Sequence, residues 1–203
     1  MKVLDLCSGL GGFSEAFAQA GHKVVRIENN PLLRDVPHTK LMCIFEFRDW
    51  LEDNMHLWRA DDAPEKIDLI LFSPPCYEFS LAYNAPRSNH EREFPNVPWE
   101  PSMDVLECGM DIIKMLKPKY HIVENVRGAI KYFKEDLGTP FQINEAYVFW
   151  GKFPSFVPGK FPSKAEKDKR HSPLRANIRG KVPIQISKAL LFAIESQKSI
   201  LDY

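Results

Sequence analysis

The stretch that decides the fold lies at the start of the chain. It reads Lys2-Val3-Leu4-Asp5-Leu6-Cys7-Ser8-Gly9-Leu10-Gly11-Gly12-Phe13. Residues 2–6 form a short apolar run, which is typical of a buried strand, and a cluster of glycines follows it. Apolar residues then recur at the spacing of one helical face, at Phe13, Ala16, Phe17 and Ala20. The stretch therefore predicts a strand, a tight turn and a helix. Glycines there let a ligand approach the backbone, and the helix N-terminus favours an anion.

The alternation of strands and helices continues beyond this stretch. Further strands are predicted at 23–27, 67–72, 121–123 and 146–150, and helices near 103–113 and from 182 onward. Residues 81–101 hold four prolines and no sustained period, so we expect a long loop there, and we expect 151–181 to be irregular. The pattern predicts an α/β fold with a mostly parallel sheet and helices on both faces. Ligands of such sheets bind beyond the carboxyl ends of the strands.

Glu28 follows the second predicted strand, 19 residues after Gly9. A carboxylate at this place commonly binds ribose hydroxyls. Together with the glycine turn it favours an adenosine-containing cofactor, and both NAD and S-adenosylmethionine remain open at this point. The alternative is a tight turn with a surface glutamate.

Two further motifs follow predicted strands. Ser73-Pro74-Pro75-Cys76 comes after the strand at 67–72, and the prolines fix the backbone that presents the cysteine. A cysteine held at the mouth of a parallel sheet is a candidate nucleophile, provided that its surroundings favour the thiolate, although a lone cysteine is more often inert. Glu124-Asn125-Val126-Arg127-Gly128 comes after the strand at 121–123. We expect its carboxylate to face Cys76, and the alternative is a surface turn.

Composition excludes several classes of protein. Hydrophobic residues make up 44% and charged residues 27% of the 203 residues, which is ordinary globular usage and excludes a disordered or collagen-like chain. Apolar runs are far shorter than the ~20 residues of a membrane span. An acid already stands at position 5, so no secretory signal is expected. The four cysteines lack CxxC pairing, which predicts reduced thiols in a cytoplasm.

Charge is unevenly distributed although the net charge is zero. Residues 160–181 hold eight Lys or Arg and two acids, so this segment carries +6. Such a segment suggests a polyanionic partner, with a solvated tail as an equal alternative.

In this order, the three motifs resemble those of the DNA cytosine-5 methyltransferase family. The glycine turn is similar to the family motif Asp-Leu-Phe-x-Gly-x-Gly-Gly, with Cys7 in place of phenylalanine. Pro-Pro-Cys matches the nucleophile motif, with Tyr77 at the usual glutamine position, and Glu-Asn-Val matches the base-binding motif. The resemblance covers most of residues 1–130. It implies a Rossmann-like methyltransferase fold, S-adenosylmethionine as the cofactor and cytosine-containing DNA as the partner.

The resemblance also implies roles for individual residues. Cys76 and Glu124 are the catalytic pair. Pro31 packs on the adenine ring, Glu46 belongs to the acidic turn that contacts adenine, and Lys181 takes the asparagine position of a C-terminal Gly-Asn-x-Val-Pro motif. The cofactor-binding residues are Asp5, Cys7, Gly9, Gly11, Gly12, Phe13, Glu28, Asn29, Pro31, Glu46, Phe47, Pro74 and Lys181. The expected nucleic-acid-binding residues are Ser80 and Arg127, together with Lys167, Lys169, Arg170, Arg175 and Arg179, which the charge of the basic 160–181 segment indicates. No metal is expected.

The implied chemistry accounts for the residue types. A Cys76 thiolate adds to carbon 6 of cytosine and makes carbon 5 nucleophilic, while Glu124 binds N3 and the exocyclic N4. The base must flip out of the duplex, and the loop after Cys76 is placed to close over it.

Two departures keep alternatives open. The family's base-contacting arginine motif is absent from 139–144, where Arg127 is a possible substitute, and only 151–181 is available in place of a target-recognition domain. We therefore expect a single methyltransferase domain over 1–203, a compact phage-type member with a small basic nucleic-acid-binding insertion at 151–181, acting in a bacterial or phage-infected cytoplasm, with no oligomer evident. The alternatives are RNA cytosine-5 methylation, a catalytically dead nucleic-acid-binding relative, and, because of Lys181, carboxymethyl transfer from carboxy-S-adenosylmethionine.

Overall fold

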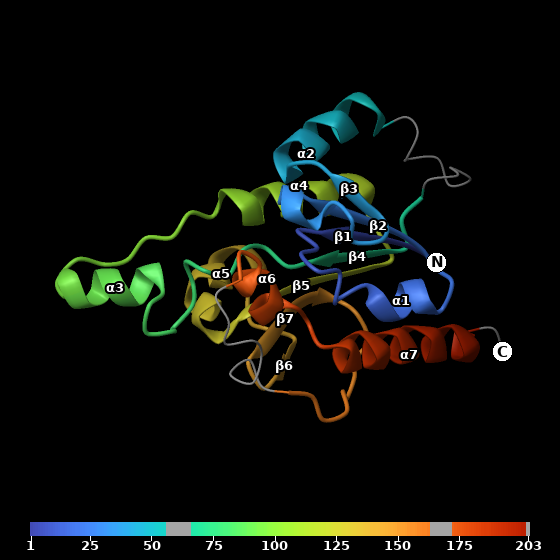
Figure 1. The fold of residues 1–203 in the computed structure, drawn as a ribbon. Helices are drawn as coiled ribbons and strands as arrows, with labels where there is room; N and C mark the ends of the chain where they lie inside the picture. Colours follow the sequence, from blue (N-terminus) through green and yellow to red (C-terminus); the bar gives the residue numbers. More distant parts are fainter. Residues whose placement is uncertain (56–65, 163–171, 202–203) are drawn as a thin grey trace.

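The computed structural model describes residues 1–55, 66–162 and 172–201 (Figure 1). Its centre is a seven-stranded sheet of described residues in the order β3-β2-β1-β4-β5-β7-β6. The strands are β1 (Lys2–Leu6), β2 (Lys23–Glu28), β3 (Thr39–Leu41), β4 (Leu69–Phe72), β5 (Tyr120–Val126), β6 (Gln142–Asn144) and β7 (Tyr147–Lys152). The strands from β3 to β5 pair in parallel, and β7 is antiparallel to both β5 and β6. The predicted α/β fold with a mostly parallel sheet is thus confirmed.

Helices cover both faces of this sheet (Figure 1). The helices are α1 (Glu15–Gln19), α2 (Ile44–Asp53), α3 (Pro86–Glu93), α4 (Asp104–Leu116), α5 (Ile130–Leu137), α6 (Arg175–Gly180) and α7 (Ile184–Leu201), with short 3-10 turns at Pro31–Leu33 and Arg127–Ala129. Side chains alternate along the strands, so Leu4 faces the core formed with α2, α4 and α5, while Val3 faces the core formed with α1 and α7.

Several expected boundaries change in the structure. Residues 81–101 are not wholly a loop, because Pro86–Glu93 forms α3, and residues 151–181 contain the end of β7 and helix α6. Strand β5 continues past the expected end at 123 to Val126, because β7 pairs with it along its whole C-terminal half. Glu124 therefore lies within a strand and not in the turn after it.

The order of the strands reverses between β1 and β4, which start the two halves of the sheet. At such a switch point the connections leave in opposite directions and open a crevice beyond the carboxyl ends of the strands. The glycine turn, Glu28, and the segment from Ser73 to Cys76 all follow or end strands at this edge.

Candidate active site

The glycine turn is bound to the end of β2 by Glu28. The backbone N–H of Gly9 donates to Glu28 Oε2 over 2.7 Å, and that of Asn30 donates to Oε1 over 2.9 Å. Gly9 and Gly11 have φ of 54° and 69°, in the left-handed region that glycine adopts without strain. Both carboxylate oxygens keep a further lone pair, so the side chain is able to accept hydrogen bonds from ribose hydroxyls as well.

Asp5 lies beneath the turn. Its carboxyl group accepts a 2.6 Å hydrogen bond from the Ser14 hydroxyl and is fully buried. Burial raises the pKa of Asp5 to about 6, against the opposing effects of Ser14 and Arg26. The aspartate therefore supports the turn from inside the protein.

The C-terminal part of the chain closes the same region. A Cβ at Gly12 would overlap the carbonyl oxygen of Val182 and the side chain of Lys181, so only glycine permits this approach. Across the opening, Asn30 Nδ2 donates to Asn177 Oδ1 of α6 over 3.4 Å. Residues 147 or more positions apart in the sequence thus form facing walls.

Cys76 lies in the segment that follows β4. The buried amide of Asn125 donates a 3.0 Å hydrogen bond to the Pro74 carbonyl, which ties this segment to β5. The carbonyl of Phe79 lies so close to Gly128 that a Cβ there would overlap it. Both contacts hold the cysteine segment against the strand that carries Glu124, which is 6% exposed.

One cavity of about 360 Å³ joins these parts, a size within the ordinary range of small-molecule sites. The sequence-predicted residues that line it are Cys7, Gly9, Gly12, Phe13, Glu28, Asn29, Pro74, Cys76, Glu124 and Lys181. The structure therefore brings together the candidate cofactor-binding residues of the glycine turn and the candidate catalytic pair.

Five predicted cofactor residues lie outside the cavity lining. They are Asp5, Gly11, Pro31, Glu46 and Phe47. Glu46 accepts a 3.0 Å hydrogen bond from the backbone N–H of Cys43 at the start of α2, and Phe47 is buried and stacks on Trp50. Residues Met42 to Phe45 line the cavity instead. They were missed because β3, which precedes them, has only three residues, two of them exposed.

The predicted nucleic-acid contacts are dispersed. Ser80 accepts a hydrogen bond from the N–H of Ala82, and exposed Arg127 donates to the Glu145 carbonyl over 2.7 Å, outside the cavity lining. Arg175 and Arg179 lie on α6, beside the cavity. Lys167, Lys169 and Arg170 lie outside the described residues.

All four cysteines are free thiols, and two of them are poor nucleophiles. Burial, followed by the charges of Glu28 and Asp5, strongly raises the pKa of Cys7. Burial raises the pKa of Cys108 to about 11. Both stay protonated near neutral pH, and a protonated thiol does not attack carbon. Tyr147, which the sequence motifs did not indicate, lies within electrostatic reach of Cys76 and Glu124, and burial and Glu124 raise its pKa.

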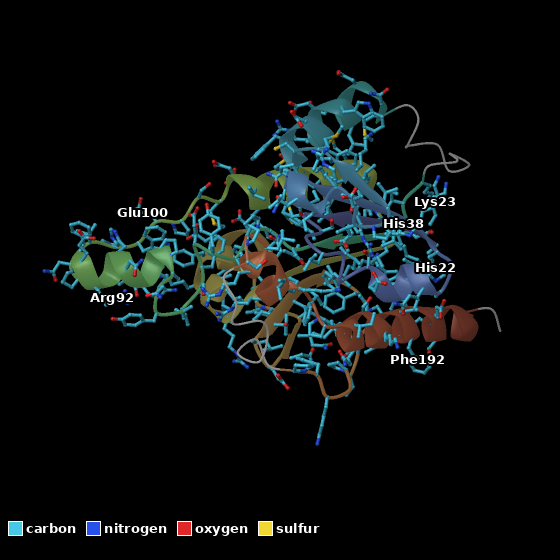
Figure 2. The ribbon with its side chains drawn as sticks, viewed as in Figure 1. His22, Lys23, His38, Arg92, Glu100 and Phe192 are labelled. Carbon is cyan, nitrogen blue, oxygen red and sulfur yellow. The ribbon has the colours of Figure 1, made fainter. Side chains whose placement is uncertain are left out.

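An arm formed by residues 81–103, with α3 at its end, projects from the body of the protein (Figures 1 and 2). Its exposed apolar residues are Leu81, Tyr83, Phe94 and Val97. The Arg92 guanidinium lies 4.1 Å from the centre of the Tyr83 ring and donates to the Tyr83 carbonyl. The arm starts five residues after Cys76 and so leads directly out of the site.

The strand order, with an antiparallel β7 beside β5, and a cofactor crevice at the switch point define an S-adenosylmethionine-dependent methyltransferase fold of the Rossmann-like α/β class. Within that class, the model of the C-5 cytosine-specific DNA methylase family matches residues 1–141. The chain belongs to this family.

Individual relatives support the same assignment. Type II methyltransferase M.AquIA of Picosynechococcus sp. is 30% identical over 139 residues, which are 66% of this chain and 51% of that protein. Type II methyltransferase M1.HphI of Haemophilus parahaemolyticus is 26% identical over 132 residues, which are 62% of this chain and 32% of that protein. The chain thus spans about a third to a half of the length of these curated relatives.

A solved structure gives a further comparison. The SAM-dependent methyltransferase from Agrobacterium tumefaciens is 16% identical, with a TM-score of 0.44 over 74% of this chain and 56% of that one. Among the described residues of the present chain, no helix is long and apolar enough to cross a membrane.

Proposed function

We propose that the chain transfers a methyl group from S-adenosylmethionine to carbon 5 of cytosine in DNA through a covalent Cys76 adduct. The observation that carries the proposal is a cavity that joins the glycine turn and Glu28 to Cys76 and Glu124. Family membership supports the same reaction class. Such an enzyme would act in the cytoplasm of a bacterium or of a phage-infected host.

The residues of the cavity fit the cofactor. Glu28 is able to hold the ribose hydroxyls, the glycine turn leaves room beside its backbone, and Met42 to Phe45 supply apolar contact for the adenine ring. Bound there, the cofactor supplies an electrophilic methyl group.

The protein groups act on the base. Cys76 Sγ forms a bond to carbon 6, and the ring electrons move toward carbon 5, which becomes the nucleophile. Glu124 hydrogen-bonds N3 and the exocyclic amino group and favours protonation at N3 as negative charge develops on the ring. After transfer, carbon 5 loses its proton and the bond between Sγ and carbon 6 breaks, which restores the thiolate.

Cys76→Ala tests this mechanism. The variant is expected to bind S-adenosylmethionine as wild type does, to transfer no methyl group and to form no trapped complex with DNA that contains 5-fluorocytosine. Cys108→Ala, a change in the core at a residue outside the cavity lining, serves as the control and is expected to keep activity. Full activity of Cys76→Ala would refute the covalent mechanism.

The choice of substrate needs its own assay. Labelled methyl transfer by the wild-type protein onto DNA and onto RNA separates the DNA enzyme from an RNA cytosine-5 methyltransferase. Absence of transfer to either, with nucleic-acid binding retained, would support a catalytically dead relative.

The position of Lys181 suggests a second candidate group donor besides S-adenosylmethionine. It lines the cavity and contacts the glycine turn at Gly12, so its ammonium group belongs to the cofactor side of the site. A cation there favours a donor with an added carboxylate, such as carboxy-S-adenosylmethionine, by a charge-assisted hydrogen bond. The test is a competition between the two donors with mass spectrometry of the base. Exclusive formation of 5-methylcytosine by wild type, with the same donor preference in Lys181→Asn, would refute the second donor.

A further inference from the structure

Arg26 is a buried cation that the sequence motifs do not explain. It lies on β2, opposite Asp5 of β1, and its side chain is 1% exposed. Burial of a guanidinium is costly unless its N–H groups are bound, so a buried arginine indicates a specific set of partners.

The guanidinium meets this requirement with four hydrogen bonds. Nε donates to the Ser14 hydroxyl over 2.9 Å, and Nη1 donates to the Pro37 carbonyl over 2.7 Å. Nη2 donates to the Gly11 carbonyl and to Glu15 Oε2, each over 3.1 Å. Four of the five N–H donors of the side chain are therefore used.

The partners belong to two separate walls of the cofactor crevice. Gly11, Ser14 and Glu15 form the end of the glycine turn and the start of α1. Pro37 lies near the end of the loop between Glu28 and β3, and the start of this loop carries Asn29 and Asn30, which line the cavity. The backbone N–H of Arg26 also donates to the His38 carbonyl over 2.9 Å, so the same residue holds this loop twice.

The fit around the guanidinium is close. A Cβ at Gly11 would overlap it, so the glycine turn and Arg26 are matched in shape. Ser14 connects the arginine to the carboxyl group of Asp5, which places the turn, the loop and the strand end in one hydrogen-bond network.

We propose that Arg26 is a positioning residue for the adenosyl cofactor, because its planar side chain fixes the glycine turn and the 29–38 loop at one separation before the cofactor binds. A site that is already ordered loses less conformational entropy on binding, so the arrangement increases cofactor affinity without contact to the cofactor. This inference rests on the proposed function only for the identity of the cofactor.

Arg26→Lys and Arg26→Met test the proposal. Lysine keeps the charge but has one donor group in place of a planar fork, and methionine loses both. The dissociation constant of S-adenosylmethionine is expected to rise about ten- to hundredfold, as on loss of an outer-shell partner at other sites. The kcat at saturating cofactor and the KM for DNA are expected to stay within about twofold of the wild-type values, since preorganisation of the crevice acts on cofactor binding. Arg48→Met, at a partly exposed arginine on α2 paired with Asp49, is the control.

Hydrogen exchange provides a second readout, because a general loss of stability would lower protection throughout the sheet and not in two segments alone. In Arg26→Lys without cofactor, amides of residues 11–15 and 29–38 are expected to lose protection together, while those of β4 and β5 keep theirs. Ser14→Ala retains the guanidinium and is expected to give the same loss of protection on a smaller scale. It replaces the Arg26 variants in this experiment if those variants fail to fold.

Either of two results would overturn the proposal: an unchanged cofactor dissociation constant in folded variants, or loss of protection in only one of the two segments. If wild type binds no S-adenosylmethionine, the proposed function fails, and the exchange experiment still decides whether Arg26 couples the two walls.

Discussion

Asp5 carries a carboxyl group whose ionisation opposes folding. Its pKa rises from 3.8 to about 6 on burial, so the folded chain keeps a proton that the unfolded chain loses between these two values. The free energy of unfolding therefore falls as pH rises through this window, by about 3 kcal/mol at about 1.4 kcal/mol per pH unit, and stays lower above it.

Asp5→Asn is expected to remove this loss of stability. Urea denaturation between pH 4 and pH 7.5 measures it, and the variant should show a flatter profile and greater stability than wild type at pH 7.5. Asp111→Asn, on the outside of α4, is the control and should follow wild type. Identical pH profiles for wild type and Asp5→Asn would contradict the assignment of the raised pKa to Asp5.

Glu124→Gln keeps the shape of the catalytic carboxylate and removes its charge. Turnover is expected to fall roughly 10²–10⁴-fold, the usual span for a positioned acid–base group, with little change in cofactor affinity. Single-turnover kinetics measures the chemical step, and Glu107→Gln on the exposed side of α4 is the control. Equal rates in wild type and Glu124→Gln would limit Glu124 to a structural role.

For individual residues, the sequence motifs predicted those that line the cavity better than those that support it from behind. Glycines, prolines, Cys76 and Glu124 are local signals next to strands. Asn125 and Tyr147 act through residues distant in the sequence, such as Asn125 with Pro74, 51 positions away, and Arg26 acts through partners on three separate elements. A single sequence does not contain these pairings.

Among the elements, the arm with α3 differs most from expectation. Its helix, Pro86–Glu93, buries no residue and is highly polar, so it lacks the apolar period that indicates a helix from sequence. Strands β3 and β6 were not predicted because they too lack a buried apolar pattern: each is a three-residue edge strand with no buried residue. The central strands were predicted because burial on both faces makes them largely apolar, as in β4, where all four residues are buried and apolar.

Tyr83 on the arm is 75% exposed and stacks with Arg92, which suits it to stack against a nucleic-acid base. Tyr83→Ala is expected to weaken DNA binding about ten- to hundredfold, because stacking of one base is worth about 1–3 kcal/mol, and to leave cofactor affinity unchanged. A titration with DNA that carries 2-aminopurine at the target position measures the DNA affinity, because its fluorescence reports the flipped base.

Phe192 provides the control for this change. It is equally exposed, at 74%, but lies on the outer face of α7, away from the arm (Figure 2). If Tyr83→Ala and Phe192→Ala bind DNA with the same affinity as wild type, the arm does not contact the base stack.

For the whole molecule, α7 joins the C-terminal part of the chain to strands formed near its start. Leu190 is fully buried in one cluster with Val3, Phe17 and Val24. Leu190→Ala is expected to lower the free energy of unfolding by about 2–5 kcal/mol, while Phe192→Ala changes it by no more than about 0.5 kcal/mol.

Chemical denaturation followed by two probes measures the loss of unfolding free energy and shows whether α7 unfolds together with the rest of the protein. Coincident transitions by fluorescence and circular dichroism are expected in both variants, because α7 packs on the same core as β1 and α1. A separate early transition of Leu190→Ala, confined to helical signal, would show that α7 unfolds independently.

The close approach of Val182 to Gly12 has a consequence for protein synthesis. The ribosome delivers the glycine turn first, but the wall that faces it comes from residues 176–182, which are synthesised long after the turn. Until then the nascent chain lacks this wall of the cavity. A prematurely terminated product that ends before residue 176 therefore carries the Cys76 and Glu124 motifs but lacks one wall of the cavity.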